Sequence, residues 1–212
     1  RPYIDLAKKV FPNANIVVDK FHIVQLLTRE LNKLRINEMK KLNTSSREYK
    51  ILKRYWKIPL TKNWELNSIY FYKNIHFKNM TSSVDILDYM LGKFPNLKEA
   101  YDFYQNFLLS ISNNDVAMLE DILNTRTDEI PMCFRKSIKS LKKLRKYVVN
   151  SLKYDYTNAM VEGKNNKIKV IKRVSYGYRS FRNFKARIML MERYKIQKGN
   201  IHSYQFAMDA AA

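Results

Sequence analysis

Apolar residues recur at helical spacing along most of this chain, and this pattern limits the fold more than any other feature. A 3.6-residue period of apolar positions extends from Phe21 to about Leu42. Residues 60–80 have only weak periodicity and several aromatic residues, so we expect an irregular segment there. The sequence therefore predicts a mainly α fold, with further helices near 3–11, 47–56, 83–92, 96–112, 115–124, 131–153, 158–174 and 180–196.

One short run departs from the helical pattern. Residues 14–18 read Ala-Asn-Ile-Val-Val, which is typical of a β-strand, and Asp19 follows directly. A lone strand forms no sheet, so its partner strands are expected upstream of Arg1 or in another chain. The chain also begins without Met or an apolar signal region. We therefore expect it to be the interior of a longer protein.

Composition narrows the class of protein further. A chain of 212 residues with 46% hydrophobic residues can bury a core as one large domain or two small ones. Its apolar runs fall far short of the roughly 18 to 20 residues that cross a bilayer, so no transmembrane helix is predicted. The single cysteine, Cys133, excludes an internal disulfide and a cysteine-built zinc site, and it fits a reducing cytosol.

The net charge of +21 is concentrated in one region. Residues 130–191 contain 17 basic residues and only two acids, Asp155 and Glu162, whereas residues 1–129 contain 20 basic and 15 acidic residues. Such a run repels itself unless a polyanion neutralises it, so nucleic acid is the leading partner, and a solvated helix face is the alternative. Aromatic residues among these charges can stack on bases or anchor helices: Tyr147, Tyr154, Tyr156, Tyr176, Tyr178, Phe181 and Phe184.

The first candidate site is Asp19 with His22. Asp19 ends the expected strand, at the kind of position where catalytic carboxylates collect in α/β sheets. His22, three residues on, would share a helical face with Asp19. The alternatives are an N-cap for Asp19 and a structural role for His22.

The second candidate site is Glu162, a carboxylate among cations. It can form an intramolecular salt bridge, or it can hold a divalent ion beside a bound phosphate backbone. Helical spacing would bring neutral amide side chains to the same face: Asn158, Asn165 and Asn166.

The third candidate site is the segment 169–184, in which two tyrosines flank Gly177 and basic residues lie on both sides. This pattern suits phosphate contact, although an ordinary glycine-terminated helix followed by a turn has the same residues. The candidate DNA-binding residues are Lys164, Lys167, Lys169, Lys172, Arg173, Tyr176, Tyr178, Arg179 and Arg182.

Two blocks of the sequence, at 11–22 and 158–188, resemble the DDE transposases of the ISL3 insertion-sequence family in order, spacing and residue type. The first block reads FPNANIVVDKFH, and the second includes Glu162-Gly163 and Tyr176-Gly177-Tyr178-Arg179. The resemblance covers about residues 3–190. It implies the C-terminal part of an RNase H-like α/β catalytic domain, with DNA as the substrate.

The resemblance also implies a chemistry. Transposases of this kind hold two Mg²⁺ (or Mn²⁺) ions with two Asp and one Glu, and these ions activate water or a DNA 3′-hydroxyl for attack on a phosphodiester. Glu162 matches the family's glutamate. Asp19 is either the second Asp or part of an Asp-x-x-His element after it, in which case both catalytic Asp residues precede Arg1. We expect this chain alone to bind DNA weakly and to lack strand transfer.

On this interpretation the chain divides into four parts. Residues 1–35 end the sheet portion, 36–150 form a helical insertion, 151–196 carry the Glu-bearing helices, and 197–212 form a tail. The expected location is the cytoplasm, at the nucleoid, with transposon ends and target DNA as partners, a second copy of the chain as a further candidate, and no membrane. The alternatives are a non-catalytic basic helical module that binds nucleic acid and an assembly domain for an acidic partner.

Overall fold

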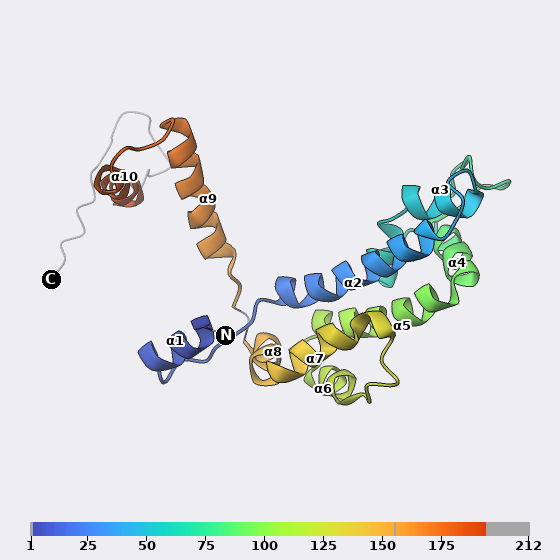
Figure 1. Cartoon of the computed structure of the whole chain (residues 1–212), viewed down its shortest axis with the longest axis horizontal. Helices are drawn as coiled ribbons and strands as arrows, with labels where there is room; N and C mark the ends of the chain where they lie inside the picture. Colours follow the sequence, from blue (N-terminus) through green and yellow to red (C-terminus); the bar gives the residue numbers. More distant parts are fainter. Residues whose placement is uncertain (1, 155, 194–212) are drawn as a thin grey trace. The chain divides into compact units, whose positions relative to one another are not determined.

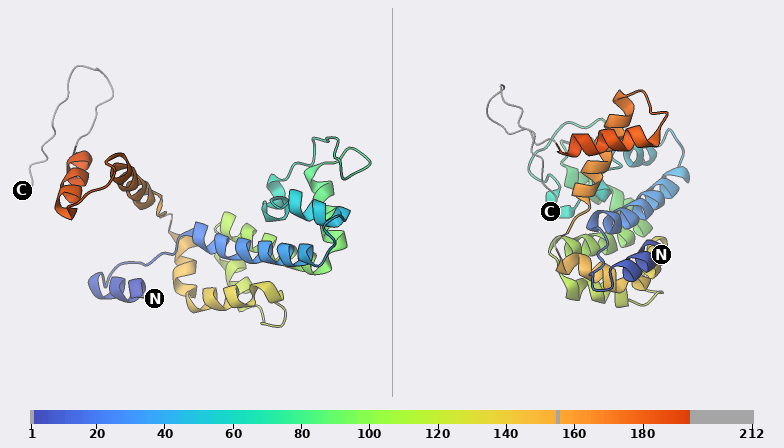
Figure 2. Two further views of the ribbon diagram at one scale, coloured as in Figure 1. Left: turned by 45° about the horizontal axis from the view of Figure 1, so that its top comes forward. Right: turned by 90° about the vertical axis from the view of Figure 1, so that its left-hand side faces the viewer.

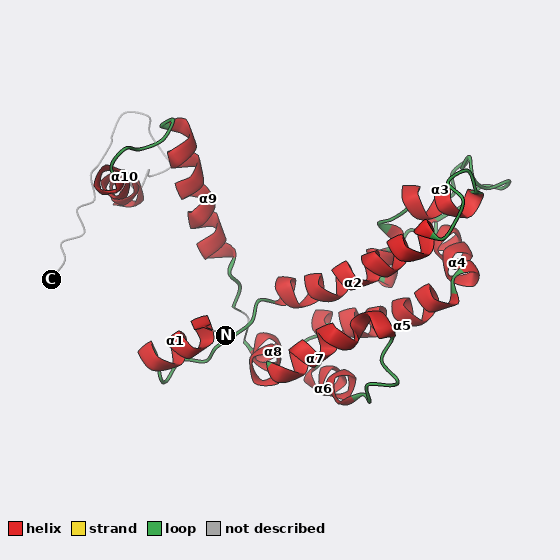
Figure 3. Cartoon of the chain, in the orientation of Figure 1, coloured by secondary structure: helices red, strands yellow, loops and turns green. Residues whose placement is uncertain are grey.

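The computed structural model describes residues 2–154 and 156–193. The chain forms two compact units, Arg1–Tyr156 and Thr157–Ala212, and each is described by itself below as unit 1 and unit 2. Every regular element of the described residues is helical, apart from an isolated bridge between Tyr72 and Thr81 (Figure 3). The predicted mainly α fold is confirmed. Within these residues no helix is both long and apolar enough to cross a bilayer.

Unit 1 contains eight α-helices among its described residues and unit 2 contains two (Figure 1). Unit 1 has three additional 3₁₀ turns at Ile58–Leu60, Asn63–Glu65 and Met132–Phe134. The α-helices are α1 (Pro2–Val10), α2 (Lys20–Lys40), α3 (Arg47–Arg54), α4 (Ser83–Lys93), α5 (Pro95–Ser112), α6 (Val116–Asn124), α7 (Arg135–Lys143), α8 (Arg145–Lys153), α9 (Ala159–Val174) and α10 (Phe181–Arg193).

Most predicted helices agree closely with the structure. Those predicted at 83–92, 96–112, 115–124 and 158–174 match α4, α5, α6 and α9 to within one residue at either end. The predicted helix at 131–153 is instead a 3₁₀ turn followed by α7 and α8. Leu144 separates the two α-helices because its backbone leaves the helical region, with φ −109° and ψ 14°. The last residues of the helix predicted at 180–196 and the predicted tail at 197–212 lie outside the described residues.

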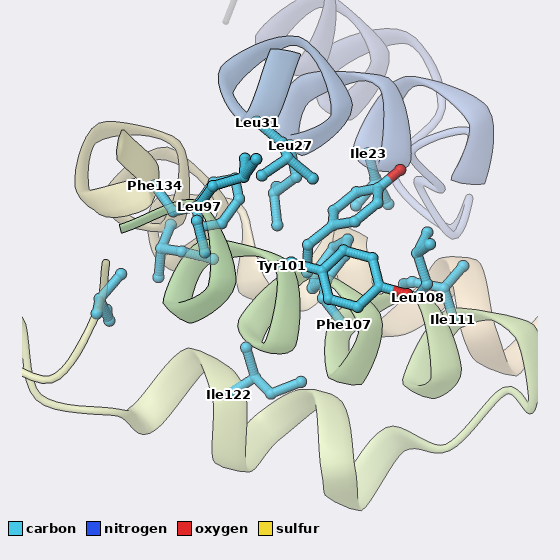
Figure 4. Close-up of a cluster of buried hydrophobic side chains, with 14 of the residues drawn as sticks. Ile23, Leu27, Leu31, Leu97, Tyr101, Phe107, Leu108, Ile111, Ile122 and Phe134 are labelled. Atoms are coloured by element: carbon cyan, nitrogen blue, oxygen red, sulfur yellow. The ribbon is translucent and has the colours of Figure 1, made fainter. Parts of the chain in front are cut away.

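The core of unit 1 is built around α2 and α5, which lie side by side (Figures 2 and 4). Ile23, Leu27 and Leu31 follow one face of α2 at four-residue intervals, and all three are buried. Buried residues of α5, including Leu97 and Leu108, belong to the same hydrophobic cluster. Helix α6 packs on α5 as well, so α5 lies between two helices (Figure 4). Each fully buried aliphatic side chain contributes roughly 1.5–3 kcal/mol.

The strand predicted at residues 14–18 is wrong for the described chain. These residues precede α2 without forming a strand, and α8 binds their backbone instead. Asn150 Nδ2 donates to the carbonyl of Ile16 at 2.9 Å, and the N–H of Val18 donates to the carbonyl of Tyr147 at 3.3 Å. A β-branched run thus meets part of its hydrogen-bonding requirement on a helix rather than on a neighbouring strand.

Two buried tyrosines on α5 give a matched test of this core. Tyr104 Oη lies 2.8 Å from Thr28 Oγ1 and donates to the carbonyl of Leu60 at 3.3 Å. Tyr101 Oη has no hydrogen-bond partner within the described residues, and burial raises the pKa of Tyr101 to about 12. We expect Tyr104→Phe to lower the free energy of unfolding by about 1 kcal/mol and Tyr101→Phe to leave it unchanged or raise it. Urea denaturation followed by circular dichroism measures both, and an equal loss in the two variants would contradict this assignment.

Cys133 packs against the core, as its small apolar side chain led us to expect. Burial raises the pKa of its thiol to about 11. Because the thiolate is the reactive species, we expect alkylation by iodoacetamide at neutral pH to be about a hundredfold slower in the folded chain than in urea. Mass spectrometry of timed samples measures the ratio, and equal rates would show that the thiol is accessible and unperturbed.

Candidate functional site

Glu162 lies in the first turn of α9, where the positive end of the helix dipole favours a carboxylate. The N–H of Glu162 donates to the carbonyl of Asn158 at 2.9 Å, and this bond starts the helix. Because α9 is continuous from Ala159 to Val174, Asn158, Glu162 and the pair Asn165–Asn166 follow one another on successive turns. All four side chains are exposed. The helix therefore presents a carboxylate and several amides to solvent.

Cations surround this helical segment. Lys164, Lys169, Lys172 and Arg173 are exposed on α9, and Arg179 and Arg182 are exposed at and after the turn that follows it. Among the side chains that the structure describes, none of these six forms an ion pair with Glu162 or with another carboxylate. Lys167, also exposed, donates from Nζ to the carbonyl of Met191 at 3.5 Å. The described residues thus do not form the intramolecular salt bridge that was one of the two interpretations of Glu162.

The turn between α9 and α10 contains two residues with left-handed backbone. Tyr176 has φ 51° and Gly177 has φ 105°, a combination that reverses the chain at the end of α9. The Tyr176 side chain is fully exposed. Tyr178 is half-buried: its Oη lies 2.7 Å from Ser175 Oγ, and its ring centroid lies 4.9 Å from that of Phe184. Of the two tyrosines predicted to contact DNA, only Tyr176 is free to stack on a base, and Tyr178 packs α9 against α10.

Unit 2 exposes much apolar surface for its size. Ile171 is its buried apolar side chain among the described residues, at 3% exposure. A helix pair with so small a core needs further cover to be stable. The exposed apolar residues of α9 and α10 are Met160, Val161, Val170, Val174, Phe181, Met189, Leu190 and Met191.

Asp19 caps α2. Its Oδ1 accepts from the N–H of Phe21 at 2.7 Å, and its carbonyl accepts from the N–H of His22 at 3.1 Å. The capping role, one of the two interpretations of Asp19, is therefore confirmed. His22 is exposed one turn into the helix, and its ring centroid lies 5.5 Å from that of Phe21. Asp19 and His22 belong to unit 1, whereas Glu162 belongs to unit 2.

The donor atoms of α9 suit a hard cation. Carboxylate and amide oxygens are the ligands that Mg²⁺ and Mn²⁺ prefer, and Mg²⁺ sites commonly combine one or two carboxylates with phosphate oxygens of the substrate. Among the residues that the structure describes, no three His, Cys, Asp or Glu side chains are grouped to hold a metal ion.

Sequence reasoning missed one set of exposed residues. Both tryptophans are exposed: Trp56, at 42%, ends the helix predicted at 47–56, and Trp64, at 47%, lies in the segment 60–80 that was predicted to be irregular. The available signal was the alternation of aromatic and basic residues between 47 and 78, which resembles that of the C-terminal region at lower charge density.

Comparison with known proteins shows which family the chain belongs to. A transposase family model, that of the ISL3 DDE transposases, matches residues 1–188. A Lactococcus lactis subsp. lactis protein described as an ATP-dependent protease is 32% identical over 192 residues, which cover 87% of this chain and 59% of that protein. The chain thus spans about three-fifths of this relative's length. No solved structure matches the chain. The chain belongs to the ISL3 family of DDE transposases.

Proposed function

We propose that this chain is the part of a DDE transposase that contributes the catalytic glutamate, Glu162, to DNA cleavage and strand transfer of an insertion sequence. The observation that carries this proposal is an exposed carboxylate in the first turn of α9, surrounded by cations with which it forms no ion pair in the described residues. Bound phosphates would neutralise the cations, and a divalent ion would join the carboxylate to the phosphates.

Different residues of the chain have different roles in this proposal. Lys164, Lys169 and Lys172 hold the phosphate backbone, and Glu162 holds the metal ion. Mg²⁺ or Mn²⁺, when bound, supplies activation of water or of a DNA 3′-hydroxyl and neutralises charge on the phosphate. Tyr176, fully exposed on the turn, is placed to stack on a base. Amide groups of Asn158, Asn165 and Asn166 orient the carboxylate or the DNA.

Asp19 fits best as part of an Asp-x-x-His element. Its Oδ1 is engaged by the N–H of Phe21, which supports a role at the start of α2 over one as the second catalytic aspartate. On this interpretation both catalytic Asp residues are supplied by sequence before Arg1. Its assignment as a metal ligand is the alternative, and it requires the cap hydrogen bond to survive beside the ion.

The RNase H-like fold remains part of the proposal. In an extended backbone, the groups of Ile16 and Val18 that face α8 lie on one edge, and those of Val17 point to the opposite edge. The backbone groups of Val17 therefore have the orientation that is needed to pair with a strand of a sheet supplied by other parts of the gene product. The same contacts bring residues 16–18 beside residues 147–150, so the helical segment between them has adjacent ends, as an insertion requires. These contacts support an insertion that begins near the start of α2 rather than at residue 36, the boundary expected from the sequence for the insertion 36–150.

Replacement of Glu162 tests the catalytic role. In the complete gene product, we expect Glu162→Gln to lower Mg²⁺- or Mn²⁺-dependent cleavage of transposon-end DNA at least about a hundredfold, because the metal loses a charged ligand. Binding of the same DNA should change by no more than a few fold. Cleavage is measured on labelled end fragments with and without EDTA, side by side with the present chain, which we expect to be inactive.

Glu99→Gln is the matched control, because Glu99 is also an exposed glutamate near the start of a helix. It should cleave like the parent protein. Full activity of Glu162→Gln would remove the metal-ligand role and leave the non-catalytic nucleic-acid-binding module as the better description.

Salt dependence tests the phosphate contacts. If the cations of unit 2 contact about six phosphates, duplex affinity should fall about a thousandfold between roughly 50 and 200 mM salt, with little sequence preference. The triple variant Lys164→Ala, Lys169→Ala, Lys172→Ala should flatten this slope. A control triple in unit 1, at the exposed residues Lys9, Lys40 and Lys98, should leave it unchanged. Fluorescence anisotropy with a labelled duplex measures the slopes, and tight, salt-insensitive binding would contradict the proposal.

A further inference from the structure

Residues 47–82 follow α2 in the chain, and we call them the basic-aromatic tip: α3 lies near the C-terminal end of α2, and residues 60–63 pack along the pair formed by α2 and α5 (Figures 1 and 2). The tip contains eight basic residues and two acids, and also eight aromatic residues, including both tryptophans of the chain. The next segment, 83–129, contains three basic residues and nine acids, and residues 130–154 contain eight basic residues and no acid. Positive charge in unit 1 is therefore concentrated in two regions, the tip and residues 130–154.

The two acids of the tip are already occupied. Glu48 Oε1 accepts from Tyr89 Oη at 2.8 Å, and Glu65 pairs with Lys62 at 2.8 Å. Lys50, Lys53, Arg54, Lys57, Lys73 and Lys78 are exposed and form no ion pair within the described residues. Burial lowers the pKa of the His76 imidazole, and the positive charges of Arg54, Lys50 and Arg47 lower it further. The tip thus carries an uncompensated positive charge.

Aromatic rings lie among these cations and remain exposed. Trp56 and Trp64 each lie under a lysine ammonium, that of Lys57 at 5.5 Å and that of Lys62 at 5.8 Å. Tyr70 is 77% exposed and Phe71 is 52% exposed. Large apolar side chains held in water are unfavourable, so a cluster of them beside cations indicates a binding surface.

The exposed rings are held by a well-defined loop. Asn67 Oδ1 accepts from the N–H groups of Ile69 and Tyr70 at 3.1 and 2.9 Å, and its Nδ2 donates to the carbonyl of Tyr70 at 2.8 Å. Paired backbone hydrogen bonds between Tyr72 and Thr81, at 3.1 and 3.0 Å, close the loop. Binding to such a surface costs little ordering entropy, because the loop is fixed before the ligand arrives.

The tip is also fastened to the helices behind it. Gln105 of α5 accepts from the N–H of Asn63 at 3.0 Å and donates to the carbonyl of Thr61 at 2.9 Å. Tyr55 donates to Asn74 Oδ1 at 2.9 Å, and Arg47 donates to the carbonyl of His76 at 2.6 Å. Hydrogen bonds therefore join α3, the loop and α5, so the cations and the exposed rings are carried on a fixed support.

We propose that the basic-aromatic tip binds nucleic acid with unstacked bases, such as single-stranded DNA, with phosphates on the cations and bases on the exposed rings. Nucleic acid is the partner that supplies both negative charge and flat aromatic faces. A second copy of the chain would bring the same positive charge to the same surface, and an acidic protein would offer few ring faces. The inference goes beyond the proposed function, since it uses neither Glu162 nor the cations of α9.

The position of the tryptophans makes the test specific. Both lie in the tip, so quenching of tryptophan fluorescence in the whole chain reports binding there even when unit 2 also binds DNA. We expect a thymidine oligonucleotide of about 12 nucleotides to quench the signal, and the same sequence as a duplex to quench it less. Heparin, a polyanion without bases, should compete for the cations without quenching.

The double variant Tyr70→Ala, Phe71→Ala should weaken the oligonucleotide's affinity at this site by roughly fivefold or more, because base–aromatic contacts are lost. Phe11→Ala removes a comparably exposed ring outside the tip and is the matched control. Circular dichroism establishes that each variant is folded. The variant Lys164→Ala, Lys169→Ala, Lys172→Ala should keep the quenching while losing duplex affinity, which separates this proposal from the proposed function.

Two outcomes would overturn the inference. One is the absence of quenching while the unit 2 cations still bind DNA. The other is equal quenching by heparin or by an acidic polypeptide that the double variant Tyr70→Ala, Phe71→Ala does not change. The tip would then bind polyanions in general, or an acidic protein.

Discussion

Burial of one face of α2 against α5 is the contact on which the rest of unit 1 depends. These are the two longest helices described, and the other helices of the core attach to this pair: α3 and α4 near one end, and α6 to α8 near the other. An isolated amphipathic helix is marginal in water, so each of these shorter helices owes its stability to the apolar surface that the pair provides. Ile23, Leu27 and Leu31 are fully or almost fully excluded from solvent. The stability of this core allows the surface of the unit to carry unpaired cations and exposed aromatic rings, which are unfavourable in themselves.

Charge in this chain is separated by region rather than balanced locally. The tip, residues 130–154 and unit 2 hold most of the excess cations, and the acidic stretch at 83–129 follows the tip in sequence. Local pairing exists, as between Lys33 and Glu30 or between Arg145 and Glu120, but such exposed pairs contribute little to stability. The excess cations therefore act on partners rather than on the fold. A protein that binds DNA benefits from this arrangement in two ways: long-range attraction speeds the encounter with DNA, and short-range contacts hold the strand in place.

The helices could be predicted from sequence because each carries its own 3.6-residue apolar period, and the grouping of Glu162 with three asparagines followed from that period alone. The prediction of a strand at 14–18 was wrong because β-branched residues favour an extended backbone whether the neighbour is a strand or, as here, α8. The break at Leu144 and the different surroundings of Tyr176 and Tyr178 depend on tertiary contacts that a local pattern does not contain. The same holds for the tip, where Asn67, Asn74 and Gln105 fix a loop without any periodicity. Carboxylates that bind the same metal ion come together through contacts between distant segments. Residue spacing along the chain does not reveal such contacts.

The hydrogen bonds from α8 to residues 16–18 have a consequence for the order of events in folding. They join segments more than 125 residues apart, whereas α4 and α5 are consecutive helices that pack on each other. Contacts between such distant segments carry a large loop-closure cost and form slowly. We therefore expect α8 to dock late on residues 14–18 during folding, and these hydrogen bonds to open before the core does. Such opening would release the segment that leads into α2 while the core helices stay packed.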